Sequence, residues 1–191
     1  MKNFKIVKWI ILSILFLVWI GVSIRICGNE GESWVKSITC LGVLFTVLWS
    51  SLNAVDVSIA QMKLRDMEKI EKSLDYAKRW ESQALVKARD FTRKIKKERP
   101  NLSDNELKQK VDTDDDLKRS VNAMLNFFEE MYISVENNLA DEIVLKRLFA
   151  DIYCGEYGIY KRFECLIEHE NMKKHLSILK DQFDKKDFSV K

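Results

Sequence analysis

The sequence predicts an all-α protein, in which an N-terminal transmembrane helical hairpin continues into a long helix and a small cytoplasmic helical domain. Three observations predict this class. Two long apolar runs near the N-terminus carry no charge, the 191 residues include a single proline, and no glycine occurs between Gly42 and Gly155. With so few helix breakers, and with apolar residues at steps of three and four, the pattern is helical and differs from the alternation of strands.

The hairpin is predicted from two uncharged apolar runs, residues 9–24 and 37–55. With their flanking residues, we place the two spans at about residues 6–26 and 37–57. A helix needs roughly 20 residues to cross the hydrocarbon core of a bilayer, and each span has about this length. We therefore predict a hairpin domain over residues 1–60 and a cytoplasmic helical domain over residues 61–191.

A signal peptide is the alternative interpretation of the first run, because Lys2, Lys5 and Lys8 precede it. The apolar core of a signal peptide usually has about 7–15 residues and ends at a small-residue cleavage site. The run in this chain is longer, and the stretch GVSIRICGNE offers a poor cleavage site. We interpret the run as a membrane span.

The orientation follows from the positive charges that flank the two spans. Three lysines precede the first span, and Lys63, Arg65, Lys69 and Lys72 follow the second. The short connecting loop contains two glutamates instead. Both termini are therefore expected in the cytoplasm.

Small and polar residues line one side of the second span. They follow one another at steps of three and four: Thr39, Gly42, Thr46, Ser50 and Asn53. Such residues let membrane helices approach closely, so this stripe is either a seam against the first span or a wet, membrane-active face of a self-associated assembly.

Beyond the second span, the apolar periodicity predicts one stalk helix over residues 61–99, which Pro100 ends. The stretch SDNE at residues 103–106 matches a capping box and predicts a new helix start. Thr113 is expected to cap the next helix, with three aspartates in its first turn. Asn137 and Asn138 are expected to end that helix.

The remaining chain predicts two helices with a break around Gly155–Gly158, and a last short helix before the charged tail. Four residues are expected to pack the domain together: Trp80, Leu125, Phe128 and Met131. In the stretch FFEE, Phe128 falls on the buried stripe and Phe127 on its flank. Glu129 and Glu130 lie about 100° apart on the helix, so they do not form a convergent acid–base pair.

The densest positive charge occurs at residues 87–99, and its members are Lys87, Arg89, Arg93, Lys94, Lys96, Lys97 and Arg99. One interpretation is a solvated face that the acidic C-terminal half compensates. The other is a contact with nucleic acid or an acidic partner protein, because clustered basic residues are what a phosphate backbone requires.

Four residues invite a metal-site interpretation: Cys154, Cys165, His169 and His175. Their spacing lacks the close cysteine pair of common zinc sites, and buried free cysteine usually packs as a small apolar residue. Glycine-rich phosphate loops and nucleophile motifs are absent from the sequence. We therefore expect no metal, no cofactor, no catalytic residue and no enzymatic activity.

Two stretches, YAKRWESQALVKARDFTRKI and MLNFFEEMYISVENNLADE, carry a resemblance to known proteins. Across roughly residues 76–150 the chain resembles a family of uncharacterised bacterial proteins with N-terminal spans and a helical domain that contains a Leu-Asn-Phe-Phe-Glu helix. The matching positions are Trp80, Arg89, Leu125, Asn126, Phe127, Phe128 and Glu129.

The layout also resembles the two-span effectors of retron antiphage systems. In those systems a reverse transcriptase with its RNA–DNA product holds the effector inactive, and release of the effector damages the inner membrane. The resemblance implies the same localisation, partner and toxin-like, abortive-infection role for this chain. The alternative hypothesis is a non-toxic adaptor that tethers a cytoplasmic partner protein to the membrane.

Overall fold

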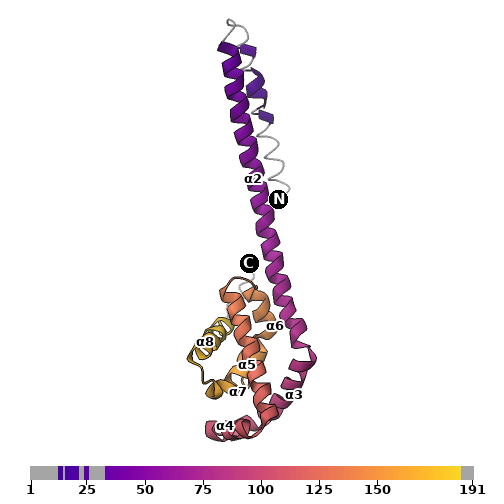
Figure 1. The fold of residues 1–191 in the computed structure, drawn as a ribbon, viewed down its shortest axis with the longest axis vertical. Helices are drawn as coiled ribbons and strands as arrows, with labels where there is room; N and C mark the ends of the chain where they lie inside the picture. The colour runs from indigo at the N-terminus through magenta and orange to yellow at the C-terminus, as the bar shows by residue number, and fades with distance from the viewer. Residues whose placement is uncertain (1–12, 15, 22–23, 26–32, 186–191) are drawn as a thin grey trace. The chain divides into compact units, whose positions relative to one another are not determined.

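The computed structural model describes residues 13–14, 16–21, 24–25 and 33–185. Every regular element in these residues is helical, which confirms the all-α class (Figure 1). The chain forms two compact units, Met1–Leu64 and Arg65–Lys191. Helix α2 (Ser33–Trp80) begins in the first unit and ends in the second.

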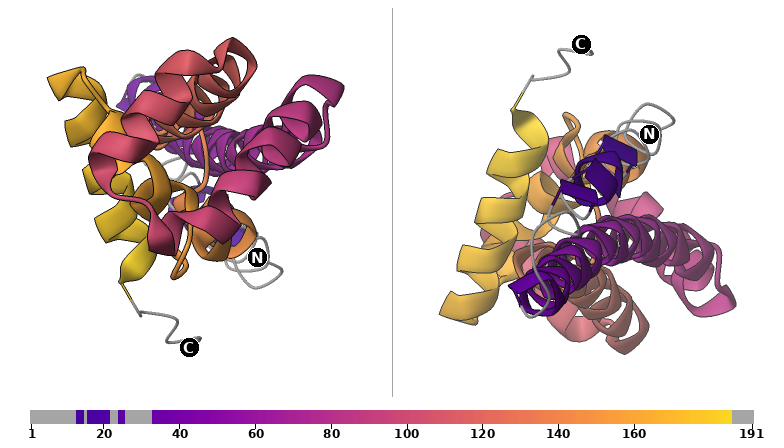
Figure 2. Two further views of the ribbon diagram at one scale, coloured as in Figure 1. Left: turned by 90° about the horizontal axis from the view of Figure 1, so that it is seen from below. Right: turned by 90° about the horizontal axis from the view of Figure 1, so that it is seen from above.

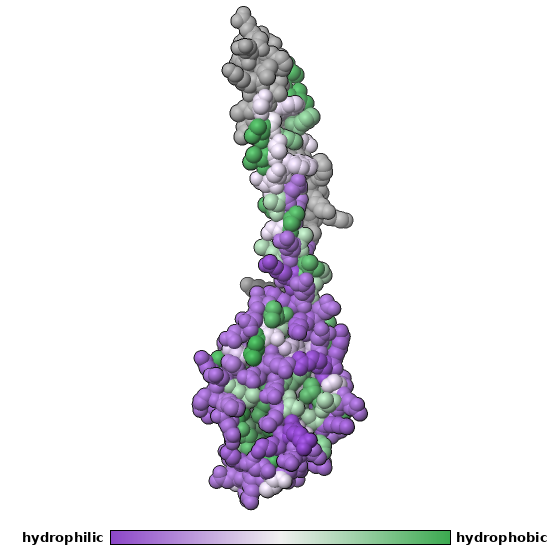
Figure 3. All heavy atoms as spheres, in the orientation of Figure 1, coloured by the Kyte–Doolittle hydropathy of each residue, from purple (hydrophilic) through white to green (hydrophobic). Residues whose placement is uncertain are grey.

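The N-terminal part of α2 contains the expected second span. Large apolar side chains are exposed there, namely Val43, Val47, Leu48, Trp49 and Val55. Figure 3 shows green apolar residues along this part of the surface. Among the described residues, no helix meets both the length and the apolarity that crossing a membrane requires. Of the expected first span, residues 6–26, the structure describes 13–14, 16–21 and 24–25, which are helical, and the other residues lie outside the described ones.

The expectation of one stalk helix over residues 61–99 is wrong. Helix α2 ends at Trp80, and α3 (Gln83–Glu98) begins after Glu81 and Ser82. Ser82 has an extended backbone, with φ −65° and ψ 149°. The change of direction lets α3 pack against α5, where it buries Leu85, Ala88, Thr92 and Ile95. Tertiary packing therefore overrides a continuous helical pattern.

Pro100 lies in the short 3-10 helix η1 (Arg99–Asn101), directly after α3, as expected of a residue that cannot continue a helix. Helix α4 (Asp104–Thr113) then starts with the expected capping box. The amide of Glu106 donates to Ser103 Oγ at 3.4 Å, and the amide of Ser103 donates to Glu106 Oε2 at 2.8 Å. This part of the sequence pattern is confirmed.

The N-cap expected at Thr113 is wrong by one residue. The hydroxyl of Thr113 donates to the carbonyl of Gln109 as part of α4. Helix α5 (Asp115–Glu136) is capped by Asp114, whose Oδ1 accepts from the amides of Asp116 and Leu117 at 3.1 and 3.0 Å. A carboxylate combines the hydrogen bond of a cap with a favourable charge at the helix start.

Helix α5 ends as the double asparagine predicts. Asn138 adopts a left-handed backbone with φ 57°, and the amides of Leu139 and Ala140 donate to the carbonyl of Ser134. The last part of the chain forms α6 (Glu142–Cys154), α7 (Ile159–Phe163), the 3-10 helix η2 (Glu164–Leu166) and α8 (Glu170–Asp184). The break at Gly155–Gly158 is therefore confirmed.

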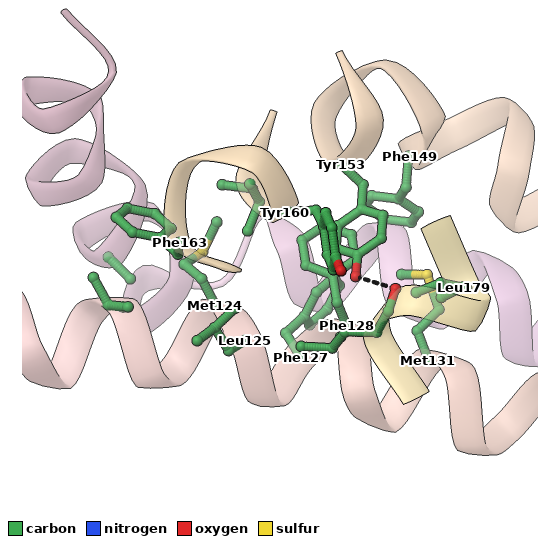
Figure 4. Packing of buried hydrophobic residues seen from close by; sticks show 14 of the residues in the cluster. Met124, Leu125, Phe127, Phe128, Met131, Phe149, Tyr153, Tyr160, Phe163 and Leu179 are labelled. Atoms are coloured by element: carbon green, nitrogen blue, oxygen red, sulfur yellow. Dashed lines mark hydrogen bonds between the residues drawn. The ribbon is translucent and has the colours of Figure 1, made fainter. Parts of the chain in front are cut away.

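An aromatic cluster forms the centre of the core in the Arg65–Lys191 unit (Figure 4). The rings of Trp80 and Phe127 lie 5.3 Å apart, and those of Phe128 and Tyr153 stack at 4.4 Å. Phe127 is only 2% exposed, so its expected place on the flank is wrong. It is buried because the end of α2 adds Trp80 to that side of α5.

Helices from distant parts of the sequence close this core. Helix α8 packs against α5 and α6 (Figure 2). The buried hydroxyl of Tyr153 donates to the carbonyl of Leu176 at 2.8 Å. Tyr76 on α2 lies 2.7 Å from the Ser134 hydroxyl and donates to the carbonyl of Glu130 at 2.9 Å. The hydroxyls of Tyr76 and Tyr153 are thereby satisfied where the helices meet.

Candidate functional site

The basic segment occupies α3 and η1, and its side chains point in different directions. Arg89, Arg93 and Lys96 are spaced as i, i+4 and i+7, so they share one face of α3. Lys87 and Lys94 share a second face, and all the lysines of the segment are exposed. Lys97, at i+4 from Arg93, falls between these two faces.

The Arg89 side chain is held by contacts with other residues of the domain. Its guanidinium lies 4.9 Å from the centre of the Trp80 ring and pairs with Glu81 at 3.3 Å. The side chain is 17% exposed. The cation–π contact and the ion pair connect α3 to the end of α2 across the break.

Arg99 is also held by hydrogen bonds within the domain. It donates to the carbonyls of Arg162 and Leu102 at 3.2 and 2.7 Å, and it pairs with Asp104 at 2.5 Å. These bonds connect η1 to the start of α4 and to α7. Of the seven residues expected to contact a partner, Arg89 and Arg99 are thus held by intramolecular contacts.

A cavity of about 530 Å³ lies between α3 and the turn that joins α6 to α7. Arg89, Arg93 and Lys96 line it from α3, and Arg162 lines it from α7. This volume falls within the range of small-molecule sites in proteins. The sequence reasoning missed the cavity, because its two walls are about 60 residues apart in the chain.

Arg162 is the buried charge of this cavity. It is 5% exposed and donates to the carbonyls of Thr92 and Tyr157 at 3.0 and 2.6 Å. No carboxylate of the described residues forms an ion pair with it. Burial lowers the pKa of its guanidinium to about 10, so the group stays charged at neutral pH. The only sequence signal for it is an arginine within the largely apolar stretch GIYKRFECL.

The two glutamates of FFEE have separate partners. Glu129 Oε1 accepts a hydrogen bond from Nδ1 of His175 at 3.0 Å. Glu130 pairs with Arg79 at 2.6 Å. The two carboxylates therefore belong to different contacts of α5, one with α8 and one with α2.

The Cys and His residues considered as a metal set are also separated. Cys154 donates to the carbonyl of Lys180 at 3.7 Å, and burial raises the pKa of its thiol to about 12. Cys165 lies 3.9 Å from Arg99, and His175 stacks on Tyr132 at 4.9 Å. Within the described residues, no three His, Cys, Asp or Glu side chains are grouped as a metal site requires.

The polar stripe of the expected second span lies on α2. Thr39, Thr46 and Ser50 are exposed, and Gly42 and Asn53 are half-buried. The Thr46 hydroxyl donates to the Gly42 carbonyl at 2.8 Å, within the same helix. A Cβ atom at Gly42 would meet nothing within 4 Å, so space for a neighbouring helix remains at this point.

The four residues expected to pack the domain all lie in its core. Trp80, Leu125, Phe128 and Met131 are between 0% and 7% exposed. Trp80 contributes both to this core and to the wall of the cavity.

Comparison with known proteins identifies one family. Residues 42–181 match the model of a domain of unknown function, DUF4760. The match covers more than half of the chain, so the chain belongs to this family. A search of curated proteins and a search of solved structures each give no match.

Proposed function

We propose that this member of the DUF4760 family is a membrane-anchored effector that acts physically rather than enzymatically. In this proposal the N-terminal hairpin inserts into the bacterial inner membrane, self-associates and damages it. The Arg65–Lys191 unit is the part that a regulator holds. The observation that carries the proposal is the contrast between the two units in where their apolar side chains lie.

In the first unit, large apolar side chains are exposed on a stretch without charge. Between Lys36 and Asp56 the chain has no Asp, Glu, Lys or Arg, and Val43 and Val47 are 57% and 56% exposed. Such a surface is unfavourable in water at about 25 cal/mol per Å² of apolar area, and lipid or further helices would cover it. This supports a membrane-embedded hairpin.

In the second unit, an aromatic cluster is buried, and polar residues dominate the face in Figure 3. Tyr157 and several aliphatic side chains are also exposed there, but charged residues lie among them in the sequence. Lys87, Lys94 and Lys97 on α3 are exposed to solvent. Clustered positive charge favours contact with phosphate backbones. This supports a nucleoprotein as the regulator.

The resemblance to retron effectors makes the proposal more specific. The regulator would be a reverse transcriptase with its RNA–DNA product, and loss of that complex would release the hairpin. The biological role would then be abortive infection in antiphage defence.

The test of the membrane-active stripe is the double variant Thr46→Leu/Ser50→Leu. Leucine removes both hydroxyls and fills the space beside Gly42, so membrane damage should be lost while insertion is retained. Ser51→Leu is the matched control, because Ser51 makes the same i−4 hydrogen bond, to Val47, on another side of α2. Dye uptake by expressing cells measures the damage. Equal dye uptake with the double variant and the wild-type chain would refute the role of the stripe.

The adaptor is the second candidate, and the closed core of the Arg65–Lys191 unit favours it, because such a unit binds partners without help from the hairpin. Replacing residues 1–60 by an unrelated two-span anchor separates the two functions. An adaptor keeps its function with the foreign anchor, whereas an effector loses it.

A further inference from the structure

The cavity between α3 and the α6–α7 turn has the features of a binding site for a small anion. Its walls carry four basic residues, Arg89, Arg93, Lys96 and Arg162, and two acidic ones, Asp151 and Glu156. The basic residues include the deeply buried Arg162, whereas both acidic residues are exposed to solvent. The buried charge of the cavity is therefore positive.

The two most buried guanidinium groups are incompletely satisfied. The Nε–H groups of Arg89 and Arg162 are buried and have no hydrogen-bond partner. Arg162 has only backbone carbonyls as acceptors. A buried charge without a counter-charge is unfavourable by several kcal/mol, and an anion bound beside it offsets that cost. Guanidinium groups suit phosphate and carboxylate oxygens, which they bind through paired N–H donors.

The rest of the lining is apolar and aromatic. Trp80, Met124 and Ile159 line the cavity and are between 0% and 7% exposed. The half-buried Ile152 and the 37% exposed Tyr157 line it with more accessible surface. Inorganic phosphate would leave this accessible surface in contact with water. A ligand with an oxyanion at one end and a flat ring at the other uses both parts of the lining.

We infer that this cavity binds a small phosphate ester with a ring system, of the size and chemistry of a nucleoside monophosphate. The phosphate lies toward Arg162 and Lys96, and the ring lies on the apolar wall. The source of that chemistry is either a free nucleotide or the phosphorylated end of a nucleic acid strand. Lys87, Lys94 and Lys97 do not line this cavity, so the inference does not depend on the proposed regulator or on membrane damage.

The test is isothermal titration calorimetry on the full-length chain in mild detergent. AMP, GMP, CMP and UMP are titrated separately, with adenosine and inorganic phosphate as the two halves of a ligand. We expect at least one nucleotide to bind at least tenfold more tightly than either half. Equal affinity for phosphate alone would refute the role of the apolar wall, and no binding of any nucleotide would overturn the inference.

Matched variants on α3 locate the site. Lys96 lines the cavity, whereas the adjacent Lys97 does not. We expect Lys96→Gln and Arg93→Gln to raise the Kd at least tenfold, and Lys97→Gln and Lys94→Gln to change it less than twofold. An equal rise in Kd for the cavity variants and for the control variants would indicate a diffuse basic surface and overturn the inference.

Short oligonucleotides distinguish the two sources of the ligand. If the natural ligand is a strand end, a 5′-phosphorylated oligonucleotide binds more tightly than AMP, and removal of its phosphate raises its Kd tenfold or more. If it is a free nucleotide, the oligonucleotides bind more weakly than AMP. Binding of both oligonucleotides with equal affinity, unaffected by Lys96→Gln, would contradict both sources.

Discussion

The turn between α6 and α7 positions Arg162 at the cavity, and Gly158→Ala tests how tightly that turn is packed. A Cβ atom at Gly158 would lie 2.4 Å from the Tyr153 carbonyl oxygen, 2.7 Å from the Tyr153 carbonyl carbon and 2.8 Å from the Gly155 nitrogen. Ordinary van der Waals contacts of a Cβ atom begin at about 3.4 Å. All three neighbours are backbone atoms, so the turn itself has to move by about 1 Å.

Forcing an extra carbon into a closely packed site costs about 1–3 kcal/mol. A destabilisation of about 2 kcal/mol, the middle of this range, corresponds to roughly a 30-fold change in the equilibrium constant for opening of the turn. We therefore expect amide protection of α6 and α7 to fall by roughly 30-fold in hydrogen exchange followed by mass spectrometry.

Gly42→Ala is the matched control, because a Cβ atom there meets nothing within 4 Å. It should leave the protection of α6 and α7 unchanged. Protection of these helices in Gly158→Ala within twofold of the wild-type value would show that the turn accommodates a methyl group, and the reasoning on its close packing would be wrong.

Three further predictions concern local contacts of the same unit. Ser103→Ala should destabilise α4 by about 1 kcal/mol, which is measured as faster amide exchange in that helix. Hydrogen bonds from Ser103 lower the pKa of Glu106. The stabilisation by the wild-type cap is therefore complete above the usual glutamate pKa and is lost as the pH falls through the lowered pKa. Tyr153→Phe should cost about 1–2 kcal/mol in urea unfolding, because the Leu176 carbonyl loses a buried donor; an unchanged midpoint would contradict this. Burial raises the pKa of Cys154 to about 12, so the folded state favours its neutral thiol. This contribution to stability is complete below the usual thiol pKa and is lost as the pH rises toward 12. Alkylation of Cys154 at pH 8 as fast as in the urea-unfolded chain would refute its burial.

Local signals in the sequence predicted much of the helical order. The capping box at Ser103, the left-handed Asn138 and the break at Gly155–Gly158 depend on neighbouring residues alone, and all three are confirmed. Pro100 likewise follows the end of α3. Short-range chemistry of this kind does not require knowledge of the tertiary fold.

Features that depend on tertiary packing were not predictable in the same way. The break after Trp80 falls within a stretch whose apolar periodicity predicts one continuous helix. Phe127 is buried because α2 covers a second side of α5. The burial of Arg162 depends on Thr92 about 70 residues earlier, and no local pattern encodes that pairing.

The candidate site shows the same division. The sequence located the basic residues of α3, but it treated them as one surface. In the fold, Arg89 lies over the Trp80 ring and Arg99 pairs with Asp104 at the start of α4. Arg93 and Lys96 line the cavity. Helical spacing alone separates the faces of α3, but which face meets another helix is a property of the whole domain.

The measurement that tests the central claim most directly is purification of the full-length chain from its native host in mild detergent, followed by identification of what is bound to it. The account predicts a reverse transcriptase with nuclease-sensitive nucleic acid, and it predicts that Lys94→Gln/Lys97→Gln reduces their recovery. Recovery of the chain alone as an oligomer, or with a protein partner and no nucleic acid, would contradict the account of a restrained membrane effector.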